Sequence, residues 1–179
     1  MTNRSETLRQ LLRKGPISVR QLTDNMGISQ PTASRAIKAL GDEVVRIGSG
    51  PSIHYVLRDA LRGFSSAPIY RITEEGKVKP LGQLIPVYPD GFVMEQADNI
   101  CLHSDGLPWW LFDMRPQGYL GRAYASRFST ELGLPANPEN WTDSDVIRAL
   151  LAHGHDAVGN VLIGEQARNH FVDMPQPVA

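Results

Sequence analysis

The chain has 179 residues, of which 41% are hydrophobic, and its formal net charge at pH 7 is −1. This is enough material for a sizeable core in one or two domains, and no run approaches the roughly 18 apolar residues of a membrane span. The start, MTNRSETLRQ, lacks the apolar stretch of a secretory signal, so we expect a cytoplasmic protein that does not enter the membrane. The one cysteine, Cys101, excludes an internal disulfide and a cysteine-based zinc site.

Charge is distributed unevenly along the chain. Residues 1–62 carry ten Lys or Arg against five Asp or Glu, whereas residues 63–179 carry eight against fourteen. The net charge is therefore +5 in the first part and −6 in the second. This asymmetry is expected when one domain meets a polyanion and the other does not, with uneven surface decoration as the alternative.

The first third begins with the patterns of two short helices. SETLRQLLRKG places leucines at helical spacing after Ser5, the expected N-cap, and ends in a glycine. PISVRQLTDNMG combines Ser18 and Gln21 in the spacing of a capping box and ends at Gly27. Both segments predict helices with one apolar face.

A third helix is predicted directly after the turn formed by Gly27 and Ile28. Ser29 is its expected N-cap, and Pro31 lies in the first turn, where a missing N–H costs little. Its inner face consists of Ala33, Ala36, Ile37 and Leu40. Its outer face consists of Gln30, Ser34, Arg35 and Lys38, with Thr32 at the edge.

These outer residues suit a helix that enters the major groove of DNA. Such a helix presents short or flexible hydrogen-bonding groups at its N-terminal end and cations along its flank. The following VVRIGSGPSIHYVL alternates like two strands around a turn, the form of a wing. Residues 4–57 thus resemble a winged helix-turn-helix, and LTDNMGISQPTASRAIKAL looks like the core of many bacterial transcription regulators.

We predict DNA contacts from both the third helix and the wing. Lys38 and Arg46 are expected on phosphates, while Gln30, Ser34 and Arg35 face the bases. The complete predicted set is Ser29, Gln30, Thr32, Ser34, Arg35, Lys38, Arg46, Ser49 and Ser52. A merely solvated polar face and a degenerate winged helix that contacts protein are the alternatives. Because one winged helix covers few base pairs, we expect a homodimer or a partner on a two-fold site.

Composition shifts at RDALRGFSSAP, which places a linker near residue 65 between predicted domains 1–62 and 68–172. IYRIT, KVKPLGQLIPVY and GFVMEQ then predict a β-meander with turns at EEG and PDG. Helices are predicted over 107–114, 118–134 and 141–154, with a capping pair of Thr142 and Asp145, before a short strand within 157–165. The overall prediction is an α+β chain with an N-terminal winged helix.

The second domain contains only weak signals for chemistry. Metal ligands are conceivable at His153, His155 and Asp156, with His103 and Asp105, but histidines just after a helix end more often face solvent or cap the helix. Neither a P-loop nor a dinucleotide-binding glycine motif occurs in the sequence. We therefore expect no metal, no cofactor and no catalytic residue in this chain.

From about residue 68 to 165 the order of elements resembles the N-terminal subdomain of the HipA-type serine/threonine kinase toxins. The resemblance lies in GQLIPVYPDGFVMEQ, DMRPQGYLGRAYASRFSTELGL and IRALLAHGHDAVGNVLIG, with the family's Pro-x-Gly turn at Pro116, Gln117 and Gly118 and its Gly-Asp-x-x-Gly stretch at residues 155–159. The preceding winged helix narrows it to HipA-like proteins of the YjjJ/HipH type. Gln117 stands where the family's turn commonly has a glutamate, so this chain has no carboxylate at that position.

The resemblance implies a non-catalytic role, because the ATP-binding and catalytic residues of HipA-type kinases lie in a body that follows this subdomain. The chain is then either the N-terminal piece of a longer kinase or a separate antitoxin similar to HipS. Either version implies docking on a HipA-like kinase body, in cis or in trans. We predict a docking surface made of Trp109, Trp110, Met114, Arg115, Pro116, Gln117 and Gly118.

A different class of function stays open at this point. A one-component regulator would bind a small metabolite in its second domain. Trp109, Trp110, Phe112 and Trp141 are the candidates to line an apolar pocket there, although tryptophans more often belong to a core.

Overall fold

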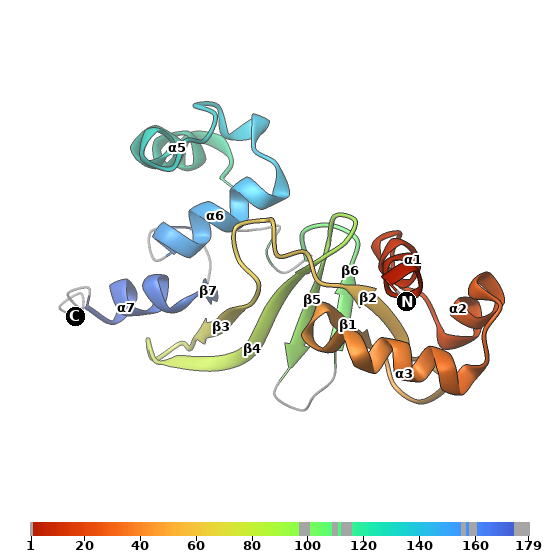
Figure 1. Ribbon diagram of the computed structural model, residues 1–179. Coiled ribbons are helices and arrows are strands. Elements are labelled where there is room, and N and C mark those ends of the chain that lie inside the picture. The colour runs from red at the N-terminus through yellow and green to blue at the C-terminus, as the bar shows by residue number, and fades with distance from the viewer. Residues whose placement is uncertain are drawn as a thin grey trace. The chain divides into compact units, whose positions relative to one another are not determined.

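The computed structural model describes residues 2–96, 101–108, 111, 116–154, 157 and 161–173. Contacts divide the chain into two compact units (Figure 1): unit 1 holds Met1–Ser66 and Ile85–Gly106, and unit 2 holds Ala67–Leu84 and Leu107–Ala179. Residues 85–106 thus group with the N-terminal part of the chain. The domain boundaries inferred from the sequence, 1–62 and 68–172, stay a prediction. Among the described residues, no helix is long and apolar enough to cross a membrane.

Unit 1 begins with three helices, α1 (Thr2–Arg13), α2 (Val19–Met26) and α3 (Gln30–Leu40). The capping box of α2 is confirmed, since the Gln21 N–H donates to Ser18 Oγ at 3.2 Å and the Ser18 N–H donates to Gln21 Oε1 at 2.9 Å. The prediction of Ser5 as an N-cap is wrong. Helix α1 starts at Thr2, because nothing in residues 2–4 interrupts the helix that carries buried Leu8 and Leu12.

The three helices enclose one core together with the wing. This helical core contains Leu8, Leu12, Leu22, Ile37, Leu40 and Leu57. The wing consists of β1 (Val44–Ile47) and β2 (His54–Leu57), paired antiparallel with Val45 opposite Val56. Short 3-10 turns, η1 (Gly41–Glu43) and η2 (Gly50–Ser52), stand before β1 and between the two strands. The predicted hairpin is confirmed.

The predicted β-meander is confirmed as β3 (Ala67–Ile72), β4 (Val78–Val87) and β5 (Gly91–Gln96). Two more strands, β6 (Cys101–Ser104) and β7 (Val161–Ile163), give the hydrogen-bonded order β6-β5-β4-β3-β7. The sequence indicated β7 but not β6. In unit 1, the apolar face of the wing packs on the end of β4 and on β5 in a second core of Val45, Ile47, Val56, Ile85, Val87 and Val93.

Unit 2 contains α5 (Gly118–Leu132), a 3-10 turn η3 (Pro138–Asn140), α6 (Asp143–His153) and α7 (Glu165–Asp173). Helices α5 and α6 confirm two predictions, and Thr142 caps α6 together with Asp145. The predicted helix 107–114 falls largely outside the described residues. Helix α7 was not predicted; Tyr70 of β3 donates to the Glu165 carboxylate at its start, and the Arg168 guanidinium lies 5.5 Å from the Tyr70 ring centre. The architecture is α+β, as predicted.

Candidate nucleic-acid interface

Local hydrogen bonds fix the start of α3. Ser29 Oγ accepts from the Thr32 N–H at 3.3 Å and donates to Thr32 Oγ1 at 2.8 Å. Pro31 stands in the first turn, where the helix needs no donor from it. The inner face of α3 buries Ala33, Ile37 and Leu40, and the last two belong to the helical core. The helix is therefore held rigidly by one side.

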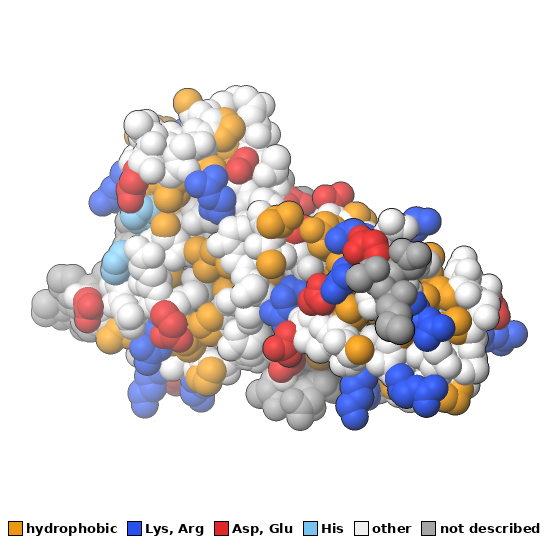
Figure 2. All heavy atoms as spheres, in the orientation of Figure 1, with side chains coloured by type: hydrophobic (Ala, Val, Ile, Leu, Met, Phe, Trp, Pro, Cys, Tyr) orange, Lys and Arg blue, Asp and Glu red, His pale blue; other side chains and the backbone are white. Residues whose placement is uncertain are grey.

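The opposite side of α3 is exposed and polar. Gln30, Ser34, Arg35 and Lys38 are all exposed. Thr32 is half-buried at the edge, and its Oγ1 also accepts from Arg35 Nη2 at 3.4 Å. Figure 2 shows Lys and Arg side chains gathered over the region of α3. This face combines the donors, acceptors and cations that a major-groove helix requires.

The wing presents its own small polar tip beside a cation. Gly48 has a φ of +78°, and a Cβ there would lie 2.5 Å from the Ser52 backbone oxygen, so the turn admits no side chain at this position. Ser49 and Ser52 are exposed in the turn. Arg46 is exposed and lies opposite Tyr55 in the register of the two strands. Short hydroxyls and one guanidinium are thus displayed together.

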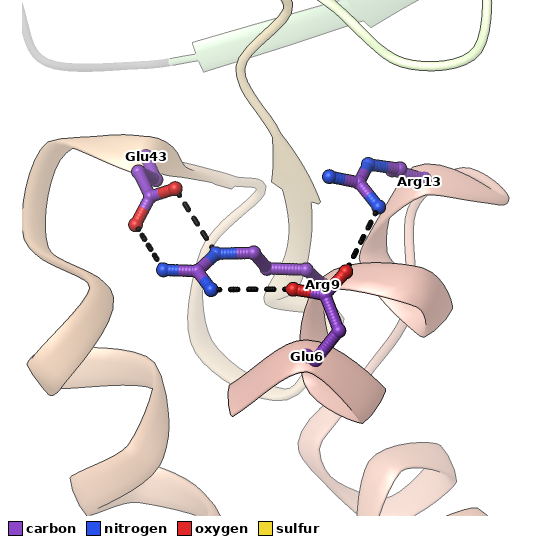
Figure 3. A network of polar contacts seen from close by, with 4 residues as sticks. All are labelled: Glu6, Arg9, Arg13 and Glu43. Carbon is purple, nitrogen blue, oxygen red and sulfur yellow. Dashed lines mark hydrogen bonds and ion pairs between the residues drawn. The ribbon is translucent and has the colours of Figure 1, made fainter. Parts of the chain in front are cut away.

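Two arginines of α1 serve the fold through a carboxylate network (Figure 3). Arg9 forms two parallel hydrogen bonds of 3.1 Å with the Glu43 carboxylate and reaches Glu6 at 3.5 Å. Arg13 pairs with the same Glu6 at 3.5 Å. The hydrogen bonds to Glu43 raise the pKa of Arg9 above its usual value. Because Glu43 follows α3 directly, the network joins α1 to the C-terminal end of that helix.

Two further arginines bind backbone carbonyls within unit 1. Arg58 donates to the carbonyls of Asp42 at 3.0 Å and Ser65 at 2.6 Å. Arg62 pairs with Asp59 and donates to the carbonyl of Gly91 at 2.8 Å. By contrast, Arg35, Lys38 and Arg46 form no ion pair with any residue that the structure describes. Within the described part of the chain, these three cations are available for phosphates.

Backbone hydrogen bonds connect the wing and the residues after it to Pro86, Tyr88 and Cys101, a contact that the sequence did not predict. The Gly48 N–H donates to the Cys101 carbonyl at 3.5 Å, and the Tyr88 N–H donates to the Leu57 carbonyl at 2.9 Å. The Asp59 N–H donates to the Pro86 carbonyl at 2.8 Å. Bonds at both ends of the ribbon hold it in place, so the wing is a rigid part of unit 1. These hydrogen bonds join segments that are distant in the sequence, so no local motif predicts them.

The predicted docking surface is described at three of its seven residues. Trp109, Trp110, Met114 and Arg115 lie outside the described residues. Gln117 precedes α5 without a side-chain capping bond, and Gly118 has a φ of +59°. A Cβ on Gly121 would lie 2.4 Å from the Pro116 carbonyl carbon, so the turn packs tightly on the helix.

Two exposed apolar side chains, which the sequence reading missed, follow this turn. Tyr119 is 79% exposed and Leu120 is 65% exposed in the first turn of α5. An apolar residue on the outer side of a predicted amphipathic helix is the signal that would have found them.

Two of the candidate metal and pocket residues, His153 and Trp141, have structural roles. His155 and Asp156 lie outside the described residues, and the described ones hold no cluster of three metal-binding side chains. His153 Nε2 lies 3.2 Å from both oxygens of Glu131, and its ring stacks on Phe128 at 3.9 Å. Trp141 is buried, with its Nε1–H donating to the Pro135 carbonyl at 2.7 Å. Trp141 therefore belongs to the core of unit 2.

Comparison with known proteins gives two family matches. A family described as "YjjJ-like toxin, middle domain" matches residues 64–172, and one described as "Winged helix-turn-helix DNA-binding" matches residues 2–43. Over 171 residues, the chain is 33% identical to Toxin YjjJ of Escherichia coli (strain K12). The aligned segment covers 95% of this chain and 38% of that protein. The chain thus spans well under half the length of this relative. No solved structure matches.

Proposed function

The chain belongs to the YjjJ-like toxin family, and from this premise we propose that it is the non-catalytic, DNA-binding part of a HipA-like toxin–antitoxin system. It acts in the cytoplasm as a transcriptional autoregulator and docks on a HipA-like kinase body. The body follows in cis if the chain is an N-terminal piece, or binds in trans if the chain is a separate antitoxin similar to HipS.

The observation that carries DNA binding is the two-sided character of α3. Its inner face is buried in the helical core, while Gln30, Ser34, Arg35 and Lys38 stand exposed on the other side. Base edges in the major groove are recognised by such amide, hydroxyl and guanidinium groups. The same unit holds Arg9 and Arg13 in internal ion pairs, whereas the recognition helix and the wing present Arg35, Lys38 and Arg46 on the surface.

Docking is proposed for the acidic remainder of the chain. Residues 107–179, which belong to unit 2, carry five basic side chains against eight acidic ones, so phosphate repels them and they are free to meet protein. The turn at Pro116–Gly118 leads into exposed Tyr119 and Leu120. An apolar pair beside a tightly packed turn loses little entropy on binding. The proposal assigns no phosphoryl transfer to these 179 residues.

The test is binding to a duplex taken from upstream of the protein's own coding sequence, followed by fluorescence anisotropy across a salt series. Affinity should fall with increasing salt, and the same duplex with a scrambled sequence should bind more weakly. Equal affinity for both duplexes would contradict a regulatory role. No binding at about 50 mM salt, where electrostatic attraction is strong, would contradict DNA binding altogether.

A further inference from the structure

A cavity of about 340 Å³ lies in unit 1, where β1 faces β5 and the start of β6. Its lining includes Val45, Arg46, Arg58, Ile85, Glu95 and Cys101. Val45 and Ile85 are buried parts of the second core and supply an apolar wall. The volume falls in the range of small-molecule sites, roughly 300–1,000 Å³.

The strand pairing turns backbone groups of β1 toward this cavity. The Arg58 N–H donates to the Glu43 carbonyl at 2.8 Å, so Glu43 and Arg58 form a hydrogen-bonded pair of the antiparallel ribbon. Such pairs alternate with non-bonded ones, which makes Arg46 and Tyr55 a non-bonded pair. The N–H and C=O of Arg46 therefore point away from β2. In the described part of the chain neither group has a backbone partner.

Positive charge exceeds negative charge around the cavity. The Arg46 side chain forms no ion pair with a described residue, and Arg58 donates only to uncharged carbonyls. Glu95 is exposed and supplies the opposing carboxylate. Burial, followed by the nearby Glu95 charge, raises the pKa of the Cys101 thiol, so this group is neutral at pH 7. Two arginines thus stand among the lining residues against one carboxylate.

We propose that this cavity binds a small anion that carries a carboxylate or phosphate group. The anionic oxygens bind the Arg46 guanidinium and backbone N–H together with Arg58, and the apolar part of the ligand lies against Val45 and Ile85. Because Arg46 also stands on the wing, an occupied cavity withdraws one cation from the DNA phosphates. This regulatory consequence rests on the proposed function, whereas anion binding itself does not.

The test is isothermal titration calorimetry of the whole chain with inorganic phosphate and, separately, with succinate, at an ionic strength held constant with chloride. Arg46→Gln should weaken binding about three- to tenfold, since a charge-assisted contact is lost at a partly exposed site. Glu95→Gln should strengthen it about threefold by removing an opposing charge. Arg20→Gln, which removes an exposed arginine outside the cavity, is the control and should change nothing.

Saturation by phosphate alone assigns a phosphorylated ligand, and saturation by succinate alone assigns a carboxylate. Absence of saturable heat for both anions up to about 20 mM, above the millimolar range of a weak single site, overturns the proposal. Equal affinities of wild type, Arg46→Gln and Glu95→Gln overturn it as well. If the anion binds with the expected order of variants but the chain binds no DNA, the cavity stands and the proposed function fails.

Discussion

The guanidinium of Arg62 lies against the carboxylate of Asp59, with Arg62 Nε 2.9 Å from Asp59 Oδ2, and both side chains are close to fully buried. Arg62 also donates to the carbonyls of Val87 and Gly91. Its guanidinium carbon lies 5.1 Å from the Phe92 ring centre. The hydrogen bonds of Arg62 to these carbonyls therefore tie the segment after the wing to the turn between β4 and β5, and Asp59 holds the guanidinium in place.

Removing Arg62 should destabilise unit 1 strongly. Arg62→Ala leaves the Asp59 carboxylate buried without its cation, which typically costs about 3–5 kcal/mol. Asp59→Asn should cost less, because an amide oxygen can still accept from the Leu61 N–H. Urea unfolding measures both, with the exposed Arg20→Ala as control, expected within about 0.5 kcal/mol of wild type. An Arg62→Ala variant as stable as this control would show that the Arg62–Asp59 pair does not stabilise unit 1.

The wing turn offers a second test of stability in two neighbouring glycines. Gly48→Ala brings a Cβ to 2.5 Å from the Ser52 backbone oxygen at a φ of +78°, so we expect a loss of about 2–3 kcal/mol. Gly50 has a φ of +54° but open space around its Cβ position, so Gly50→Ala should lose only about 1 kcal/mol. Thermal unfolding compares the two, and equal losses would contradict the steric argument.

His103 should make the stability of unit 1 depend on pH. Its Nε2 is buried without a hydrogen-bond partner among the described residues, and burial lowers the pKa of His103 below the usual 6.5, against the weaker opposing effect of Asp105. The folded protein therefore holds His103 neutral more firmly than the unfolded chain does. The stability is fully present above pH 6.5 and is lost as the pH falls through the folded pKa.

The measurement is the urea midpoint of wild type and His103→Gln at about pH 7.5 and about pH 5. Wild type should lose more stability between these two values than the variant, because glutamine does not titrate. A variant that loses as much as wild type would assign the pH dependence to other groups.

Local rules predicted most of the elements. Caps at Ser18, Ser29 and Thr142 fixed where α2, α3 and α6 begin, because a side-chain hydroxyl acts within three residues of itself. The exposed face of α3 followed from the 3.6-residue period in the same way. Ser5 misled because a good capping residue also fits inside a helix that starts earlier.

Pairings between distant segments were beyond the same rules. Strand β6 and the second core depend on contacts such as Gly48 with Cys101, which no periodicity encodes. Helix α7 likewise packs against distant segments, and Tyr70 of β3 donates to Glu165 at its start. The cavity beside Arg46 exists only because these pairings bring β1 close to β5 and β6.

DNA recognition should separate into a base-reading and a phosphate-binding part of α3. Arg35→Ala should weaken binding by about 1–3 kcal/mol and reduce the preference for the specific duplex. Lys38→Ala should weaken binding to both duplexes alike and lower the salt slope by about 1. Fluorescence anisotropy measures both effects. Lys77→Ala, an exposed cation of unit 2, is the matched control and should bind like wild type.

Docking on a kinase body is expected at the start of α5. Tyr119 and Leu120 are largely exposed there, beside a turn that Gly121 allows to pack on Pro116. Tyr119→Ala and Leu120→Ala should each weaken binding to a HipA-like kinase body about tenfold, because truncated apolar anchors lose their buried contacts.

Leu61→Ala is the control for this surface, since Leu61 is 87% exposed in unit 1 and should not matter. Surface plasmon resonance with the kinase body as a separate protein measures the affinities, and Trp109→Ala, Trp110→Ala and Arg115→Ala complete the series. The chain alone should show no heat with ATP, because the proposal leaves nucleotide binding to the body. If all five variants bind as tightly as wild type, the docking surface lies elsewhere; micromolar ATP binding to the chain alone would contradict its non-catalytic role.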